Sequence, residues 1–331
     1  MTTVPTPGGT TVRSRRLAPA LITSLRPRQW LKNVLVDGTG TLRRLSPSPT
    51  APGADREAFW ATAGGPGLTG VITRAALRLR PITSSWMSVH TERVATLDRL
   101  MDRLRGHDRR FPYTVAWLDV RARGPRLGRG VITSGSHADE DEARANGIAE
   151  PTSYRPRRRL TAPMTPVATV TPFSARAFNE LWYRHAPSRE VAVLQPLEVF
   201  FHPLDRIRGW NRLYGPHGFV QYQFVVPDGR EDVVEQAVST FGRGAGPAFL
   251  TVLKRFRDHP GGPLSFPRAG WTLAVDLPAR PGSRLAPVLD ALDRVVAEAA
   301  GAVYLVKDSR CRPDLVATMY PGCGWPRDRP R

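Results

Sequence analysis

The sequence predicts an α+β fold in which helices cover one face of an antiparallel sheet. Several segments alternate apolar and polar residues with a period near two, which is typical of half-buried strands. Two segments of the second half place apolar residues at helical spacing. The 32 prolines and 29 glycines among 331 residues indicate many strand ends and loops, in a chain long enough for one large domain or two ordinary ones.

Residues 1–36 differ in composition from those that follow. Proline, threonine, glycine and arginine dominate as far as Arg16, a composition typical of disorder. From Asp37 onward strands and turns alternate, and "GTGTLRRLSPSP" is predicted to form a strand with a polar turn. The glycine-rich "AGGPGLTG" leads into "GVITRAALRLRP", whose period near two predicts another strand.

The middle of the chain is predicted to contain one helix, two strands and a long loop. "VATLDRLMDRLRG" places Leu97, Leu100 and Leu104 at helical spacing and is expected to end at Gly106. The strands "YTVAWLDV" and "GRGVITSG" follow. The charged, proline-rich segment 137–170 is expected to be a mobile loop or lid, with its acidic "ADEDEARA" a solvated part of that loop.

The second half is more regular. We expect a strand end at "EVFFHPLD", a short helix and turn at "RIRGWNRLYGPHG", and a strand at "FVQYQFVVPDG". A helix over "EDVVEQAVSTFG" precedes two strands, "AFLTVLKRF" and "GWTLAVDLP". The clearest helix is "SRLAPVLDALDRVVAEAAG", which presents one apolar face and ends at Gly301. "AVYLVKDSR" is expected to close the set as a strand.

The net charge of +19 raises the question of an anionic partner. Arginine supplies all but three of the 48 basic residues, and these arginines are scattered along the chain. No helix-turn-helix, zinc finger or stacked-aromatic motif accompanies them, so nucleic-acid binding is disfavoured. Anionic lipid or a phosphorylated substrate fits the charge equally well. No run of about 18 apolar residues and no apolar core of a secretory signal occurs, so neither a membrane span nor a signal peptide is expected.

The cysteines and histidines offer little chemistry. Cys311 and Cys323 are the only cysteines, and free thiols in a reducing compartment are favoured over a bridge between them. No ligand pair has the spacing of a zinc site, so no metal is expected. His185 and His202 have no ligand spacing around them and are assigned structural roles.

Strand geometry selects a more informative set of residues. On "FVQYQFVV" the side chains of Gln221 and Gln223 point to one face. Lys254 and Phe256 share a face of their strand, and Lys307 is placed within the last strand. Adjacent strands that present amides and lysines would suit a polyhydroxylated or phosphorylated ligand, although a plainly solvated face is the alternative. Lysine is kept for three positions in an arginine-rich chain, which favours a specific use of its compact charge.

The glycine-rich loop is ambiguous by itself. "AGGPGLTG" lacks the Lys-Ser/Thr of a P-loop and is not followed by a helix as a dinucleotide-binding turn would be. It either lies against a phosphate-bearing cofactor or forms a tight turn before a strand.

Longer segments resemble one family in their order along the chain. These segments are "FWATAGGPGLTG", "AWLD", "ELWYR", "FHPLD", "WNRLYGPHGFVQYQFVVP", "LSFPRAGWTLAVDLP" and "VYLVKDSR". They resemble the decaprenylphosphoryl-β-D-ribose 2′-oxidases, FAD-binding flavoproteins of the vanillyl-alcohol-oxidase type that are related to sugar-1,4-lactone oxidases. The likeness extends from about Asp37 to Tyr320. By contrast, residues 25–36 resemble the start of a decaprenyl-phosphate phosphoribosyltransferase.

The resemblance implies an activity. Hydride would pass from C2 of the ribose ring of a lipid-linked sugar phosphate to N5 of FAD. The resulting 2′-keto sugar would go to a partner short-chain-type keto-reductase, which serves cell-wall arabinan synthesis. Contact with the inner membrane would be peripheral, on its cytoplasmic or cell-envelope side, and no nucleic acid would be involved.

The resemblance also implies the residues of the site. Gly67, Gly70, Val71 and Tyr304 should contact FAD, and Lys307 should be the catalytic charge. The implied substrate-binding residues are Trp117, Gln221, Gln223, Lys254, Phe256 and Lys307. The chain departs from the family at Ala274, where a cysteine is frequent, at Thr272 in place of asparagine, and at Phe201 in place of tyrosine.

The family resemblance implies four parts. Residues 1–36 are expected to be a disordered or foreign leader, and 37–83 a remnant of an FAD-binding domain. Residues 84–310 would form the substrate domain, and 311–331 an irregular tail. Because the family's glycine-rich flavin-binding half precedes the point matched by Asp37, the chain resembles an N-terminally truncated member. Three hypotheses follow: an active oxidase, an inactive remnant, or a sugar-1,4-lactone oxidase-like flavoenzyme.

Overall fold

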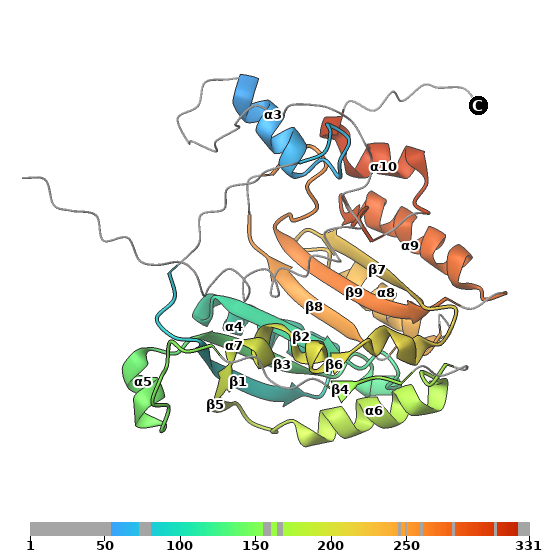
Figure 1. Ribbon diagram of the computed structural model, residues 1–331. Helices are drawn as coiled ribbons and strands as arrows, with labels where there is room; N and C mark the ends of the chain where they lie inside the picture. The colour runs from blue at the N-terminus through green and yellow to red at the C-terminus, as the bar shows by residue number, and fades with distance from the viewer. Residues whose placement is uncertain are drawn as a thin grey trace, which may run out of the picture. The chain divides into compact units, whose positions relative to one another are not determined.

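The chain divides into two units, Met1–Leu77 and Arg78–Arg331. The computed structural model describes residues 54–72, 81–154, 160–163, 168–243, 246–248, 250–258, 261–279, 282–307 and 310–323 (Figure 1). The expectations for residues 1–53, and for most of the strand expected after the glycine-rich loop, lie outside these residues.

The described part of the first unit is one helix and a turn. Helix α3 (Ala54–Ala63) is closed by a hydrogen bond of 3.1 Å from the Gly64 amide to the Trp60 carbonyl. The chain then reverses through a bond of 2.8 Å from the Leu68 amide to the Gly65 carbonyl. This turn is the glycine-rich loop of the sequence.

The second unit is built on an eight-stranded sheet in the order β10-β7-β9-β8-β2-β3-β1-β5, in which neighbouring strands pair antiparallel. Its strands are β1 (Trp86–Val94), β2 (Tyr113–Leu118), β3 (Gly130–His137), β5 (Val191–Pro196), β7 (Phe219–Val226), β8 (Thr251–Phe256), β9 (Gly270–Pro278) and β10 (Ala302–Val303). A separate parallel pair is formed by β4 (Leu160–Thr161) and β6 (Ile207–Arg208).

Helices occupy the connections between these strands. The α-helices of this unit are α4 (Leu97–Arg110), α5 (Glu140–Ala145), α6 (Pro172–His185), α7 (Leu197–Phe201), α8 (Glu231–Arg243), α9 (Leu285–Glu298) and α10 (Pro313–Met319). The short 3-10 turns are η2 (Gly124–Arg126), η3 (Pro203–Arg206), η4 (Trp210–Tyr214) and η5 (Pro321–Cys323). None of the described helices is both long enough and apolar enough to cross a membrane.

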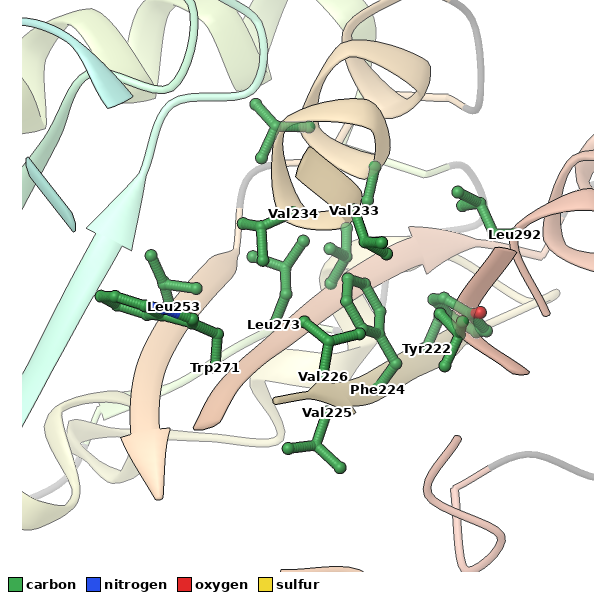
Figure 2. Close-up of a cluster of buried hydrophobic side chains, with 14 of the residues drawn as sticks. Tyr222, Phe224, Val225, Val226, Val233, Val234, Leu253, Trp271, Leu273 and Leu292 are labelled. Atoms are coloured by element: carbon green, nitrogen blue, oxygen red, sulfur yellow. The ribbon is translucent and has the colours of Figure 1, made fainter. Parts of the chain in front are cut away.

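One face of the sheet carries the core, under α4, α8 and α9. The alternation of β7 turns Tyr222, Phe224 and Val226 toward this face, where all three are buried. Figure 2 shows Val233 and Val234 of α8 over the same strands. Burying each large apolar side chain stabilises the fold by roughly 1.5–3 kcal/mol relative to leaving it exposed. The predicted α+β fold, an antiparallel sheet covered by helices, is confirmed, although the helices are not confined to one face.

The opposite face is contacted by α7 over β2 and β3, and by the 3-10 turn η4 over β7, where Tyr214 stacks on Phe219 with ring centroids 4.5 Å apart. Phe200 of α7 lies over Gly135 of β3, where a Cβ atom would come within 3.2 Å of its ring. Phe201 of the same helix contacts Tyr113 of β2 edge to face, with ring centroids 4.8 Å apart. The part of this face formed by β7, β8 and β9 carries the glutamines and lysines of the sequence analysis.

Several local expectations were wrong. The helix expected to stop at Gly106 continues to Arg110, because the apolar stripe extends to His107, which is buried and contacts Ser134. The acidic cluster in the expected loop forms α5, because the Asp139 side chain caps its first turn by accepting from the Glu142 amide at 2.6 Å.

Three further expectations failed near chain reversals. The strand end expected at "EVFFHPLD" is helix α7. The last strand ends at Val303, and a turn follows it. The tail expected to be irregular contains α10, which is held to the sheet because the Tyr320 hydroxyl donates to the Val303 carbonyl at 2.7 Å.

Candidate active site

The strand register assembles a row of side chains across the face of the sheet opposite the core. Trp117 of β2 lies opposite Val252 of β8. Val252 lies opposite Ala274 of β9, which in turn lies opposite Gln223 of β7. Directly opposed residues have Cβ atoms about 4.5–5.5 Å apart, so four strands contribute to one continuous line. Ala274, the smallest member, contributes only a methyl group between Val252 and Gln223.

Rows on either side of this line add the charged groups. On one side Lys254 of β8 lies opposite Thr272 of β9. On the other side Gln221 of β7 lies opposite Asp276 of β9. Because side chains alternate between faces, residues two apart on each strand share this face. The face therefore presents amides, a hydroxyl, an ammonium and a carboxyl from three adjacent strands.

A hydrogen-bond chain fixes Lys307 against this face. Its ammonium donates to the Gln223 side-chain oxygen at 2.7 Å. The Gln223 amide nitrogen donates to the Thr272 hydroxyl at 3.0 Å, and that hydroxyl donates to the Phe224 carbonyl at 2.8 Å. Since lysine can only donate, the Gln223 amide can take only one of its two orientations. The chain has a donor and an acceptor at every step.

A turn after β10 brings Lys307 to the face. The Tyr304 amide still bonds to the Gln223 carbonyl at 2.8 Å, as a strand residue would. The Lys307 amide then bonds back to the Tyr304 carbonyl at 3.0 Å, so the chain reverses. The ammonium consequently lies 5.5 Å from the centre of the Tyr304 ring, within the range of a cation–π contact.

Asp276 is the buried acid of this face. Its side chain is fully buried, and its Oδ1 accepts from the Gln221 amide at 2.6 Å. Its Oδ2 is buried without a hydrogen-bond partner among the described residues. Burial raises the pKa of Asp276 to about 7, against the opposing effects of the Gln221 hydrogen bond and the Lys307 charge. The same carboxyl, together with burial as the larger cause, raises the pKa of the Tyr214 hydroxyl.

Burial and neighbouring charges shift the pKa values of the two lysines. Surrounding protein desolvates the ammonium groups, although both side chains keep exposed atoms, and this lowers the pKa of Lys254. Desolvation also lowers the pKa of Lys307; the Asp276 carboxyl opposes this shift and the Lys254 charge adds to it. The site thus couples three ionisable groups on adjacent strands and the turn.

Aromatic rings border the lysines. Phe266 stacks on Tyr304 with centroids 4.5 Å apart and an interplanar angle of 19°. Phe256 of β8 meets Phe266 edge to face at 5.9 Å. These rings supply a flat apolar wall beside the polar chain, a combination suited to a planar or sugar ligand.

The predicted cofactor residues of the first unit lie in the glycine turn. Gly67 and Gly70 have φ angles of 86° and 131°, which side chains other than hydrogen rarely permit. No atom lies within 4 Å of where a Cβ would stand at either position. The two glycines are therefore needed for the backbone conformation of the turn.

Comparison with known proteins places the chain. Over 289 residues it is 35% identical to decaprenylphosphoryl-beta-D-ribose oxidase of Mycolicibacterium smegmatis, a match that covers 87% of the chain. It is 37% identical over 271 residues to an uncharacterised protein of the mprA 5′ region of Streptomyces coelicolor, covering 80% of this chain and 73% of that protein. The chain is thus similar to a decaprenylphosphoryl-β-D-ribose oxidase over most of its own length. The resemblance found in the seven sequence segments is confirmed.

Three further results describe the extent of this similarity. The chain spans 61% of the length of the mycobacterial oxidase. No family model matches it. Among solved structures, Physcomitrella patens BBE-like 1 aligns with a TM-score of 0.35 and 9% identity, over 73% of this chain and 49% of that chain.

The family's expected substrate residues gather on one face of the second unit. Gln223, Lys307 and Tyr304 are linked by the contacts above, and the rows and rings add the remaining expected residues, Trp117, Gln221, Lys254 and Phe256. Gly67, Gly70 and Val71 belong to the first unit. Their roles toward FAD and substrate stay predictions.

Sequence reasoning missed Asp276, whose part in this face is structural and electrostatic. The signal was present, because Asp276 follows Thr272 and Ala274 at the period of two that assigns them to this face. It also missed Phe266, which lies between strands and has no periodic signal.

Cavities elsewhere in the second unit are not lined by these residues. One of about 310 Å³ lies between α9 and α10, and another of about 440 Å³ is lined in part by His217, Val220 and Arg310.

Proposed function

We propose that this chain is an FAD-dependent oxidoreductase that oxidises the 2′-hydroxyl of decaprenylphosphoryl-β-D-ribose to the 2′-keto sugar. The observation that carries the proposal is the fixed ammonium of Lys307 on a polar sheet face, in a chain 35% identical to an oxidase named for that substrate. An oriented cation beside amides and aromatic rings is suited to binding a sugar and stabilising negative charge on a reacting oxygen.

The residues of this face fit a flavin ring. The row Trp117, Val252, Ala274 and Gln223 places two small apolar side chains between an indole and an amide, so no long side chain projects there. Two ammonium groups nearby favour the negative charge that a reduced flavin ring carries. When bound, FAD would supply the hydride acceptor. Tyr304 would hold it from this face.

The protein's own part would be binding, orientation and charge. Lys307, held by Gln223, would donate a hydrogen bond to the sugar oxygen and stabilise the negative charge that develops there, while the proton of that hydroxyl would pass to solvent. Gln221 would bind a further hydroxyl, because its amide oxygen stays available while its nitrogen donates to Asp276. Lys254 would keep a positive charge toward the phosphate of the substrate.

The product determines the class of reaction that follows. A 2′-keto sugar on a lipid phosphate can be reduced by a keto-reductase to the epimeric alcohol, and we place such a reductase as the partner of this enzyme in cell-wall arabinan synthesis. The substrate would lie at the membrane surface, so contact with the membrane would be peripheral.

Flavin uptake and substrate-dependent bleaching test the proposal. The purified full chain is titrated with FAD, and bound flavin is followed by its absorbance and quenched fluorescence. Anaerobic addition of decaprenylphosphoryl-β-D-ribose should then bleach the flavin absorbance. A chain that binds no FAD, or bound flavin that the substrate leaves oxidised, refutes the proposal. Bleaching by a sugar-1,4-lactone instead would assign the chain to the lactone oxidases.

Variants locate the chemistry on Lys307. Lys307→Met should retain flavin and lose bleaching by on the order of a hundredfold or more, a loss typical of removing one charge-stabilising group. Arg312→Gln is the matched control, because it removes a cation whose pair with Asp314 lies on the exposed surface. Equal bleaching rates in Lys307→Met and the control would refute the role of Lys307.

A further inference from the structure

Helix α6 presents large apolar side chains to solvent. Phe173, Phe178, Leu181 and Trp182 are exposed to 83%, 41%, 70% and 47%, respectively. Phe178 lies three residues before Leu181 and four before Trp182, so these three form an apolar stripe on one side of the helix, and Phe173 lies at the edge of that side near its N-terminus. A helix on the surface of a globular protein normally turns such a stripe inward, so α6 has the reverse arrangement.

The inward face of α6 is fixed by polar contacts. Asn179 is buried and donates to Asp119 Oδ1 at 2.9 Å, and Glu180 pairs with the buried guanidinium of Arg129. Thr171 and Ser174 close the N-terminus of the helix with reciprocal hydrogen bonds. Rolling α6 to bury its apolar stripe would break these contacts, so the outward direction of the stripe is built into the fold.

The apolar stripe has rigid aromatic content and stands at the periphery of its unit. Phe178 and Trp182 stack with centroids 5.9 Å apart and an interplanar angle of 16°. Figure 1 shows α6 on the outside of the second unit, away from α9 and α10. The edge strand β5, which follows α6 along the chain, adds the exposed Val191 and Val193. Contiguous apolar surface of this kind marks an interaction site.

Arginines lie along one flank of α6, beside Phe173. Arg176 of α6 lies close enough to Arg121 and Arg123 for their charges, together with burial as the larger cause, to lower the pKa of Arg121. Arg189 adds an exposed cation just beyond the helix. The acid of the helix, Glu180, is already neutralised by arginines on both sides. This flank of α6 is therefore positively charged, which favours an anionic partner.

Charge complementarity decides between a second copy of the chain and a lipid surface. In a symmetric dimer through this face, each copy would bring its arginines toward those of the other, which is unfavourable. An anionic bilayer accepts the aromatic and leucine side chains below its headgroups and pairs the arginines with phosphates.

We propose that the outward face of α6 is a membrane-binding surface that inserts Phe173, Leu181 and Trp182 into anionic lipid while the flanking arginines bind headgroup phosphates. This inference rests on the peripheral membrane contact of the proposed function and assigns a surface to it; its test requires neither FAD nor the sugar substrate.

Vesicle flotation with the full chain tests the proposal. Wild-type protein should float with phosphatidylglycerol–phosphatidylcholine vesicles and much less with pure phosphatidylcholine. The double variant Leu181→Gln/Trp182→Gln should lose affinity by at least about tenfold, because it removes two side chains that would be buried in lipid. Leu68→Gln, at an exposed leucine of the first unit, is the matched control and should bind as wild type does.

A second variant separates the charge from the apolar stripe. Arg123→Gln/Arg176→Gln should weaken binding to anionic vesicles and reduce its sensitivity to salt, with binding to pure phosphatidylcholine unchanged. Circular dichroism and thermal unfolding confirm that each variant folds. Absence of wild-type flotation, or equal flotation of the apolar double variant, overturns the proposal. So does a wild-type dimer in ultracentrifugation that the double variant abolishes, because the stripe would then bind a second copy.

Discussion

Asn in place of Asp276 should change how the stability of the protein depends on pH. The carboxyl is fully buried, and its Oδ2 has no hydrogen-bond partner among the described residues. Burial raises its pKa from 3.8 to about 7. Asp276→Asn keeps the acceptor for the Gln221 amide but cannot ionise, so it removes the cost of a buried charge without removing that hydrogen bond.

The sign follows from the two pKa values. Below the unfolded value of 3.8 the carboxyl is protonated in both states and no cost arises. As pH rises from there toward 7, the unfolded state loses its proton while the folded state retains it, so the wild-type protein loses stability. A difference of about three pKa units corresponds to roughly 4 kcal/mol, at about 1.36 kcal/mol per unit. The advantage of the variant should grow by that order between about pH 4 and pH 8.

Urea unfolding followed by tryptophan fluorescence measures this difference at each pH. A constant offset of about 1–3 kcal/mol against the variant is expected, because its amide nitrogen gains no partner where Oδ2 is buried, so the slope with pH carries the information. Asp232→Asn is the control: Arg230 lowers the pKa of Asp232, so its difference from wild type should be flat above about pH 5. A flat difference for Asp276→Asn as well would refute a raised pKa at Asp276.

Other perturbations test the buried network and the lysine pair. Arg129→Ala should lower the free energy of unfolding by about 3–5 kcal/mol in chemical denaturation, because Asp119 would remain buried without its cation. Tyr222→Phe should cost about 1–2 kcal/mol in the same assay, since its hydroxyl donates to a buried carboxylate of α9 at 2.8 Å. Lys254→Gln should raise the pKa of Lys307, measured as slower acetylation of Lys307 at neutral pH by mass spectrometry; unchanged reactivity would show that the two ammonium groups are not coupled.

Periodicity predicted the main features of the site because its strands are long and half-buried. The alternation in "FVQYQFVV" correctly separated Gln221 and Gln223 from Tyr222 and Phe224. The same period held on β8 and β9, so the shared face followed once the strands were adjacent. The register that aligns Trp117 with distant strands could not be predicted, because it depends on pairing between segments far apart in sequence.

The failures occurred where tertiary contacts override a short local pattern. Lys307 was expected within a strand, yet β10 ends at Val303 and a turn places the ammonium against Gln223. Lys307 does lie on the same face as Gln223, as expected, but a turn and not a strand brings it there. Helix α7 likewise replaced an expected strand end, since Phe200 packs over Gly135 of β3. Patterns of four or five apolar residues do not distinguish a strand from a buried helical turn.

The departures from the family at Thr272 and Ala274 are compatible with an intact site. Thr272 accepts a hydrogen bond from Gln223 and donates one to the Phe224 carbonyl. The hydrogen-bond chain that orients Lys307 therefore ends on a backbone group. An asparagine there would also offer an oxygen to Gln223, and a hydroxyl performs the same task with a shorter reach. Ala274 contributes no polar group. Its side chain is smaller than the cysteine that is frequent in the family, in a row that continues through Val252 to Trp117. What holds Lys307 is thus a set of hydrogen bonds within the second unit, so its orientation does not depend on the residue at position 274.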